Sequence, residues 1–406
     1  METAHPSFSA TLLRWFDLNG RDLPWRNTKD PYAIWLSEVI LQQTRINQGM
    51  DYWLRFMQRY PRVDDLAAAT EDEVLRLWQG LGYYSRARNL HAAARQIAHR
   101  GSFPDTFQEI RQLKGVGDYT AAAVASIAFH RPVAVVDGNV YRVLSRYFGI
   151  FTPINSTEGK KEFAALAQSL LPPQTPDRYN EALMDFGALQ CKPVTAAKAS
   201  SQTRSNIGET LQPDLFSPSP AADHSVSAAR LLSSAAPSFC AQCPLGEGCV
   251  AYREGWVAQL PVKLKKTKVK TRRMTYLYIR CKGHIALRRR GSGDIWQGLW
   301  EPVLYKDVED KSTPAHAAQR KETPLEMETS IAPSLAALPF QTIEATSRCV
   351  SLRHVLTHRI LLADFYTWDT DVRPALPPEY IWIREEDIDQ YAIPRLVELF
   401  LEAVSQ

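Results

Sequence analysis

The sequence lacks any uninterrupted run of 18 apolar residues, and no long apolar stretch follows a basic start at its N-terminus. Membrane helices need about 20 apolar residues, and secretory signals need such a start. We therefore expect neither, and we expect a cytoplasmic protein without membrane partners. A large charge excess is also missing, since the net charge is +4. This small sum does not exclude nucleic acid, because local clustering of charge can outweigh it.

Cysteine is scarce, with six residues in 406, yet Cys240, Cys243 and Cys249 fall within ten positions. In a chain of this size such crowding favours metal ligation over disulfides, because a large core needs no covalent cross-link. The hydrophobic share of 45% and the charged share of 23% are close to globular averages. The length exceeds what one core usually organises and predicts two domains.

Helical periodicity dominates residues 8–191, where Asp30 is expected to cap a helix that begins at Pro31. Residues 194–238 are rich in Ser, Ala, Pro, Gln and Thr, which predicts a disordered insertion. Strand character is present in three later segments, 274–290, 350–368 and 379–388. A closing helix is expected to follow them over 394–404. We predict a mainly α domain over 1–255, a basic linker over 256–272 and an α+β domain over 273–406.

The basic stretch 263–273 holds seven Lys or Arg residues in eleven positions. Lys266, Lys268, Lys270 and Arg272 alternate as on one face of an extended strand. This pattern fits either a solvated linker or a surface that contacts phosphate.

A glycine turn lies between two helical segments, at Leu113, Gly115, Val116 and Gly117. Both glycines allow positive φ, and the amides of such a turn can grip a phosphate without reading a base. A plain structural turn is the alternative. Asp137 follows Gly117 by 20 residues, before Gly and Asn, where it either caps the next helix or supplies a reactive carboxylate.

Glu38 is an acid inside an otherwise apolar helical segment, with Gln42 one turn beyond it. Apolar neighbours would raise its pKa, which suits a proton donor, whereas a surface ion pair is the alternative. A second motif, residues 80–89, contains Tyr83, which is either a core side chain or an aromatic wedge. Arg86 and Arg88 in that motif are expected to contact phosphate or to face water.

Together these motifs resemble the helix-hairpin-helix DNA glycosylase superfamily and, within it, the MutY-type adenine glycosylases. The resemblance implies hydrolysis of the N-glycosidic bond of adenine opposite 8-oxoguanine or guanine in duplex DNA, by a monomer. It implies Glu38 as proton donor to the base and Asp137 as the carboxylate that faces the sugar. Asn139 would hold that carboxylate, and Tyr119 would lie beside the sugar. Related bifunctional enzymes carry lysine at the Tyr119 position, so this chain is expected to leave an abasic site without cutting the strand.

The resemblance extends to DNA contacts and the cysteines. Gln42 and Tyr83 would wedge beside the oxidised guanine. Cys240-x2-Cys243-x5-Cys249, with Cys191 upstream, resembles the loop that binds a four-iron, four-sulfur cluster. Zinc is the alternative, since four thiolates also suit a structural zinc ion. Relatives keep the first two cysteines close, whereas 48 residues separate Cys191 from Cys240 here.

The C-terminal domain resembles the Nudix-like module of MutY-type enzymes, which reads 8-oxoguanine. Residues 291–303 match its Gly and Trp hairpin, and residues 353–358 match its lesion-contacting loop. His358 and Thr357 are the predicted contacts there, and Leu356 departs from the aromatic residue common in relatives. No run of closely spaced glutamates is present, so we expect no hydrolysis of free nucleotides.

Overall fold

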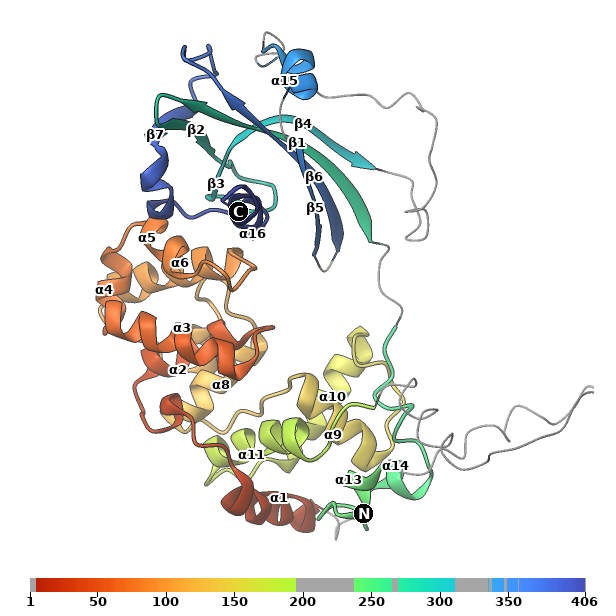
Figure 1. The fold of residues 1–406 in the computed structure, drawn as a ribbon. Helices are drawn as coiled ribbons and strands as arrows, with labels where there is room; N and C mark the ends of the chain where they lie inside the picture. Colours follow the sequence, from red (N-terminus) through yellow and green to blue (C-terminus); the bar gives the residue numbers. More distant parts are fainter. Residues whose placement is uncertain are drawn as a thin grey trace, which may run out of the picture. The chain divides into compact units, whose positions relative to one another are not determined.

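A computed structural model describes residues 5–194, 237–264, 269–310, 335, 338–346, 349–356 and 358–405. Most of the predicted insertion lies outside these residues, as do Lys266, Lys268 and Thr357. Contacts divide the chain into two compact units (Figure 1). The first contains residues 1–34, 105–112 and 116–264, and the second contains 35–104, 113–115 and 265–406. The predicted domain boundaries near 255 and 273 stay a prediction.

The first unit is helical. Its elements are α1 (His5–Asn19), η1 (Pro24–Arg26), α7 (Phe107–Ile110), α8 (Asp118–Phe129), α9 (Gly138–Phe148), α10 (Thr157–Leu170), α11 (Pro176–Leu189), α13 (Ser238–Ala241) and α14 (Val250–Arg253). The apolar faces of α1, α9, α10 and α11 form its core, in which Phe8, Phe163 and Phe186 are at most 1% exposed. No strand occurs in residues 5–194, so the helical prediction for that stretch is confirmed.

Helix α2 (Pro31–Leu41) runs from the first unit into the second. The Asp30 Oδ1 atom accepts a hydrogen bond of 3.0 Å from the backbone amide of Tyr32. Pro31 sits at the first helical position, where its missing N–H costs nothing. The predicted cap is therefore confirmed. The other helices of this part are α3 (Ile46–Arg59), α4 (Val63–Ala68), α5 (Glu71–Leu77) and α6 (Ser85–Arg100).

The rest of the second unit is a mixed seven-stranded sheet with helices. Its elements are β1 (Lys270–Cys281), β2 (His284–Arg289), β3 (Trp300–Glu301), β4 (Val303–Asp310), α15 (Phe340–Thr346), β5 (Cys349–Val355), β6 (Arg359–Asp369), β7 (Tyr380–Arg384), η3 (Glu385–Gln390) and α16 (Arg395–Val404). The strand order is β3-β2-β1-β6-β5, with β4 also pairing with β1 and β7 with β2. Only β1 and β6 pair in parallel among the described strands.

The predicted strands and closing helix of this sheet are confirmed. Lys282 and Gly283 both have positive φ and form the two-residue turn between β1 and β2. One face of the sheet is buried against α16 by Tyr276, Phe365 and Phe400, which are all fully buried. The Phe365 ring stacks on the Tyr276 ring and on the Phe400 ring. In the described part of the chain, no helix has the length and apolar content that crossing a bilayer requires.

Candidate active site and cysteine cavity

Asp137 precedes helix α9 and binds its first amides. Its Oδ1 atom accepts from the amides of Asn139 at 2.8 Å and Val140 at 2.7 Å. Its Oδ2 atom accepts from Asn139 Nδ2 at 2.8 Å. Burial raises the pKa of Asp137, and these three hydrogen bonds oppose that shift without cancelling it. Asp137 thus caps the helix and also keeps a perturbed carboxyl group, so the two sequence alternatives are compatible.

Arg142 fixes the orientation of Asn139. Its Nη2 atom donates to Asn139 Oδ1 at 2.8 Å and to the carbonyl of Gly187 at 2.5 Å. Because a guanidinium only donates, the amide oxygen must face it, and the NH2 group must face Asp137. A Cβ atom at Gly187 would lie 2.6 Å from the Asn139 Cβ, so only glycine allows this approach. Sequence reasoning did not identify Arg142 or Gly187 as part of this site. The one available signal was the position of Arg142, one helical turn beyond Asn139.

Tyr119 lies in the first turn of α8, in the same unit as Asp137. Its hydroxyl lies 3.5 Å from Met184 Sδ. Its side chain is partly buried. The position that would hold an amine in a bifunctional relative therefore holds a phenol.

The glycine turn has one strained residue rather than two. Gly115 has φ +76°, and a Cβ there would lie 2.5 Å from Asn89, so glycine is required. Gly117 has φ −96° and precedes α8 in an extended conformation, so it does not use the positive φ that glycine allows. The side chains of Leu113 and Val116 are buried and anchor the turn. Binding of a phosphate by the backbone amides of this turn stays a prediction.

Glu38 lies on α2 in the second unit and is only 7% exposed. Its neighbours Trp35 and Val39 are also buried. This burial excludes the alternative of a solvated surface ion pair. Gln42 follows the last residue of the helix.

Tyr83 is exposed at the end of an unusual loop. Gly80, Gly82 and Tyr83 all have positive φ, at 93°, 70° and 48°. A left-handed aromatic residue carries backbone strain, which is typical of functional positions. The Tyr83 side chain is 47% exposed, so the alternative of a core side chain is wrong.

Arg86 does not lie where the sequence suggested. It is 9% exposed, and its guanidinium donates to backbone carbonyls inside the second unit, so the expectation of phosphate contact or solvent exposure is wrong for this residue. Burial lowers its pKa to about 10. Arg88 is half-buried, and its Nη1 atom donates to the carbonyl of Gln297 at 2.6 Å. Phosphate contact by Arg88 stays a prediction.

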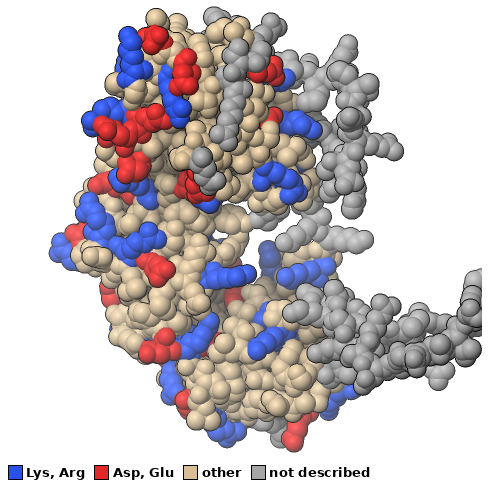
Figure 2. All heavy atoms as spheres, in the orientation of Figure 1, with Lys and Arg blue, Asp and Glu red and all other residues tan. Residues whose placement is uncertain are grey.

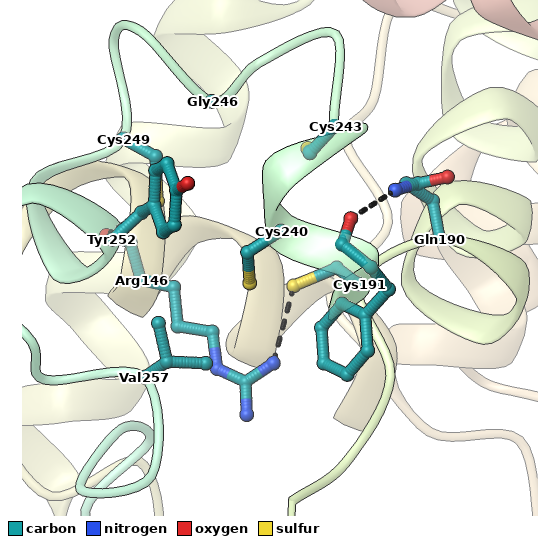
Figure 3. Close-up of a pocket in the computed structure, with 10 residues that line it drawn as sticks. Arg146, Gln190, Cys191, Cys240, Cys243, Gly246, Cys249, Tyr252 and Val257 are labelled. Carbon is teal, nitrogen blue, oxygen red and sulfur yellow. Dashed lines mark hydrogen bonds between the residues drawn. The ribbon is translucent and has the colours of Figure 1, made fainter. Parts of the chain in front are cut away.

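The four predicted cysteine ligands line one cavity in the first unit (Figure 3). It is also lined by Arg146, Gln190, Phe239, Gly246, Tyr252 and Val257. Arg146 Nη1 lies 3.4 Å from Cys191 Sγ, and Cys249 Sγ lies 3.5 Å from the Arg146 carbonyl. Thus Cys191 reaches the cavity despite the 48 intervening residues. Arg146, one turn after Arg142, was also missed.

The chemistry of the donor set fits both metal groups that the sequence suggested, because four thiolates suit either a four-iron, four-sulfur cluster or a structural zinc ion. Burial, followed by neighbouring thiols, raises the pKa of Cys240 to about 11. Burial also raises the pKa of Cys243 to about 12, although the amide of Leu245 opposes this shift. Thiols of raised pKa become thiolates beside positive charge, which either metal group would supply.

The described end of the basic stretch, residues 270–273, lies in β1 of the second unit. Arg272 is 11% exposed and paired with Asp294 and Asp307, so it is not part of a solvated phosphate-contacting stripe. Figure 2 shows other Lys and Arg groups beside Asp and Glu groups on the face drawn.

The predicted lesion-contacting loop, residues 353–358, begins in β5, which ends at Val355. The Leu356 amide donates to the Arg359 carbonyl at 2.8 Å. His358 directly precedes β6, and Thr357 lies outside the described residues.

Comparisons with known proteins match both parts of the chain. Residues 36–173 match the model of the HhH-GPD superfamily base excision DNA repair proteins, and residues 275–403 match the NUDIX domain model. A thermostable thymine-DNA glycosylase structure aligns over 62% of this chain and 97% of its own, with 27% identity and a TM-score of 0.48.

Relatives named adenine DNA glycosylase match much of the chain. The mouse protein is 46% identical over 198 residues, which cover 46% of this chain but only 38% of the mouse protein. The protein of Buchnera aphidicola subsp. Acyrthosiphon pisum is 30% identical over 306 residues, which cover 75% of each chain. With that extent of identity, and with matches to both the HhH-GPD and the NUDIX models, this chain belongs to the adenine DNA glycosylase family.

Proposed function

We propose that this protein hydrolyses the N-glycosidic bond of adenine opposite 8-oxoguanine or guanine in duplex DNA, and leaves an abasic site. Family membership supports the reaction class. The observation that carries the proposal is the Asp137 carboxyl group, which burial perturbs and which Asn139 holds at the start of α9. Carboxylates with raised pKa at an oriented position are typical of catalytic sites.

The proposed chemistry needs two acids in different roles. The reaction leaves negative charge on the departing base and positive character on the sugar, and the nucleotide must leave the base stack to be reached. Glu38 would protonate adenine, since a buried carboxyl group is suited to hold a proton. Asp137, ionised, would stabilise the sugar cation. Its Oδ2 atom accepts one hydrogen bond from Asn139 and keeps acceptor capacity for this role.

Base removal without strand cleavage follows from residue 119. A lysine amine there would form a Schiff base with the sugar, whereas the Tyr119 phenol cannot. Water would therefore be the final nucleophile. The abasic product should keep an intact strand until alkali is added.

Several residues would bind the duplex. The amides around Gly115 and Gly117 would grip phosphate, and Gln42 with Tyr83 would occupy the stack beside the oxidised guanine. The strained, exposed conformation of Tyr83 supports this role. The turn with Thr357 and His358 would contact the lesion. A monomer is sufficient for these contacts.

We further propose that the four cysteines hold a four-iron, four-sulfur cluster. The cluster would order residues 191 and 240–249 against α9 and take no part in hydrolysis. Purified protein should contain about four iron atoms and absorb broadly in the blue visible range. Cys243→Ser should lose both signals, whereas Cys349→Ser, exposed on β5, should keep them. Stoichiometric zinc in place of iron would favour the zinc alternative.

The deciding experiment for the reaction uses duplexes with A opposite 8-oxoguanine, A opposite G, and T opposite G, followed by alkali cleavage. The first two should be cleaved at adenine only after alkali. No release from the first duplex would end the proposal, and release of thymine alone would identify a pyrimidine glycosylase instead.

Glu38→Gln tests the proton donor. The rate of adenine release in a single turnover should fall by roughly three orders of magnitude, while duplex affinity is kept, because general acid catalysis contributes about 10²–10⁴-fold. Glu158→Gln, exposed on α10, is the matched control and should leave the rate unchanged. A near-normal rate for Glu38→Gln would remove this acid from the mechanism.

A further inference from the structure

Arg86 is a buried cation to which the proposed chemistry gives no role. It extends from the first turn of α6 and is 9% exposed. Its acceptors belong to two segments: Val39 O at 3.1 Å, Ile40 O at 2.9 Å and Gln42 O in one, Leu81 O at 3.3 Å and Gly82 O at 3.2 Å in the other. One guanidinium thus binds two stretches of backbone that are some 40 residues apart in sequence.

The first stretch is the C-terminal end of helix α2. The last carbonyls of a helix have no partners within the helix, and a cation there is favoured by the helix dipole. Arg86 therefore caps the helix that carries Glu38. Directly after the capped end lie Gln42 and Gln43, and Gln43 has a positive φ of 58°.

The second stretch is the loop that presents Tyr83. Arg86 Nη2 donates to carbonyls on either side of the left-handed Gly82. The guanidinium also lies over two rings, 5.0 Å from the centroid of Trp78 and 5.8 Å from that of Tyr83. Strained backbone persists only where the surroundings over-determine it, and these contacts supply that constraint. Lysine has neither the planar fork nor the number of donors to replace them.

We propose that Arg86 is a positioning residue that joins the end of α2 to the Tyr83 loop. Through it, the acid Glu38 and the wedge Tyr83 keep one spacing, so that the helix and the loop act on DNA together. The functional part of this inference rests on the proposed adenine glycosylase reaction, and its structural part does not.

Hydrogen exchange in the free protein tests the structural part. Arg86→Lys should speed amide exchange about tenfold both in residues 42–44 and in residues 80–84, because each segment loses a shared constraint. Arg95→Lys, exposed on the same helix, should change neither segment. Faster exchange in one segment alone, or in neither, would overturn the proposal.

A double-mutant cycle tests the functional part. Arg86→Lys should slow single-turnover adenine release roughly 10- to 100-fold, the effect of misplacing a group by about 1 Å. In a Tyr83→Ala background the same change should cost less than about threefold, because the two residues act through one unit. Multiplicative losses, or an unchanged rate for Arg86→Lys, would overturn the coupling. Failure of the wild-type protein to release adenine would instead overturn the proposed function, and the exchange test would still decide the structural part.

Thr44→Val covers the case in which Arg86→Lys does not fold. The Thr44 hydroxyl accepts from Arg86 Nη1 at 3.4 Å and Nη2 at 3.5 Å, so the change removes one acceptor and keeps Arg86. Exchange in residues 80–84 should rise about two- to threefold, since a weakened grip on one segment loosens the other. Unchanged exchange there would show that Arg86 does not join the segments.

Discussion

Asp137 and Asp294 are both partly buried, yet their surroundings shift their pKa values in opposite directions. Asp137 receives two backbone amides and one carboxamide, all neutral donors, and burial raises its pKa. Burial acts on Asp294 in the same direction, but hydrogen bonds from Arg272 and the amide of Ile295, with the charges of Arg272 and Arg290, outweigh it and lower the pKa. Both carboxylates receive neutral donors, but only Asp294 is also bound directly by arginines, which make it a structural anchor.

The two sites also differ in what surrounds them. Asp294 is part of an ion network that joins β1, β4 and β6 through Arg272, Asp307 and Arg359, together with Arg290 directly after β2. Arg142 hydrogen-bonds Asn139, and its charge lowers the pKa of Asp137 less than the three hydrogen bonds do. Mutations around Asp137 should therefore change the rate of the reaction, and mutations around Asp294 should change the stability of the fold.

The largest expected effect is at Asp137. Asp137→Asn should slow single-turnover adenine release at least about 10³-fold, since it removes the charge that stabilises the sugar cation. Its stability at pH 7 should be unchanged or higher. A raised folded pKa means that ionised Asp137 opposes folding as the pH rises through that pKa, and asparagine caps helices equally well. Urea unfolding measures the stability, and single-turnover kinetics measure the rate. A variant that loses stability but keeps its rate of adenine release would contradict this prediction.

Asp294→Asn should do the opposite. The free energy of unfolding at pH 7 should fall by about 2 kcal/mol, less than the 3–5 kcal/mol typical of a fully buried pair, because the side chain is 32% exposed. The folded pKa is lowered, so this stabilisation is present above the ordinary carboxyl pKa of about 4 and is lost as the pH falls below it. Urea unfolding at pH 7 and pH 3.5 should show the difference shrink.

The matched control for that change is Asp369→Asn, whose side chain is 73% exposed and 3.9 Å from Arg280. It should alter stability by less than about 0.5 kcal/mol. Equal losses from Asp294→Asn and Asp369→Asn would show that the Asp294 network does not stabilise the sheet.

Asn139→Ala should move the pH dependence of the reaction. It removes a donor that lowers the pKa of Asp137, so that pKa should rise further. Since Asp137 acts ionised, the acidic limb of the rate profile should shift to higher pH by about one unit, the value of one such hydrogen bond. Asn155→Ala, bound to Leu264 in the same unit, should leave the limb in place. A shift to lower pH would mean that Asn139 does not donate to the carboxylate.

A smaller loss than that of Asp294→Asn is expected for Asp307→Asn in the same network. Arg272 would keep its two hydrogen bonds of 2.6 Å to Asp294, so the loss should be about 1 kcal/mol, below that of Asp294→Asn. Combining both changes should cost more than their sum, because Arg272 would be left without a counter-charge. Urea unfolding of the three variants measures this, and strict additivity would contradict a shared network.

The sequence was most informative where a site is local. Asp137 binds amides two and three residues ahead, and Asp30 caps the helix that follows it, so chain geometry alone predicts both contacts. Strand composition likewise predicted the strand character of residues 274–290, which lie in β1, β2 and the turn between them. Such interactions need no knowledge of tertiary packing.

The contacts that were predicted wrongly depend on distant partners. The acceptors of Arg86 at the end of α2 lie 44 to 47 residues away, and those of Arg272 lie 22 and 35 residues away. A basic residue in a polar pattern indicates solvent or phosphate until its partners are known. The approach of Gly187 to Asn139 is equally invisible in sequence, because it depends on how α11 packs on α9.

The most direct test of the comparison is titration of the two carboxyl carbons by NMR, assigned with Asp137→Asn and Asp294→Asn. Asp137 should titrate above the ordinary aspartate pKa of about 3.9 and Asp294 well below it. Equal pKa values, or Asp294 titrating above Asp137, would contradict this expectation.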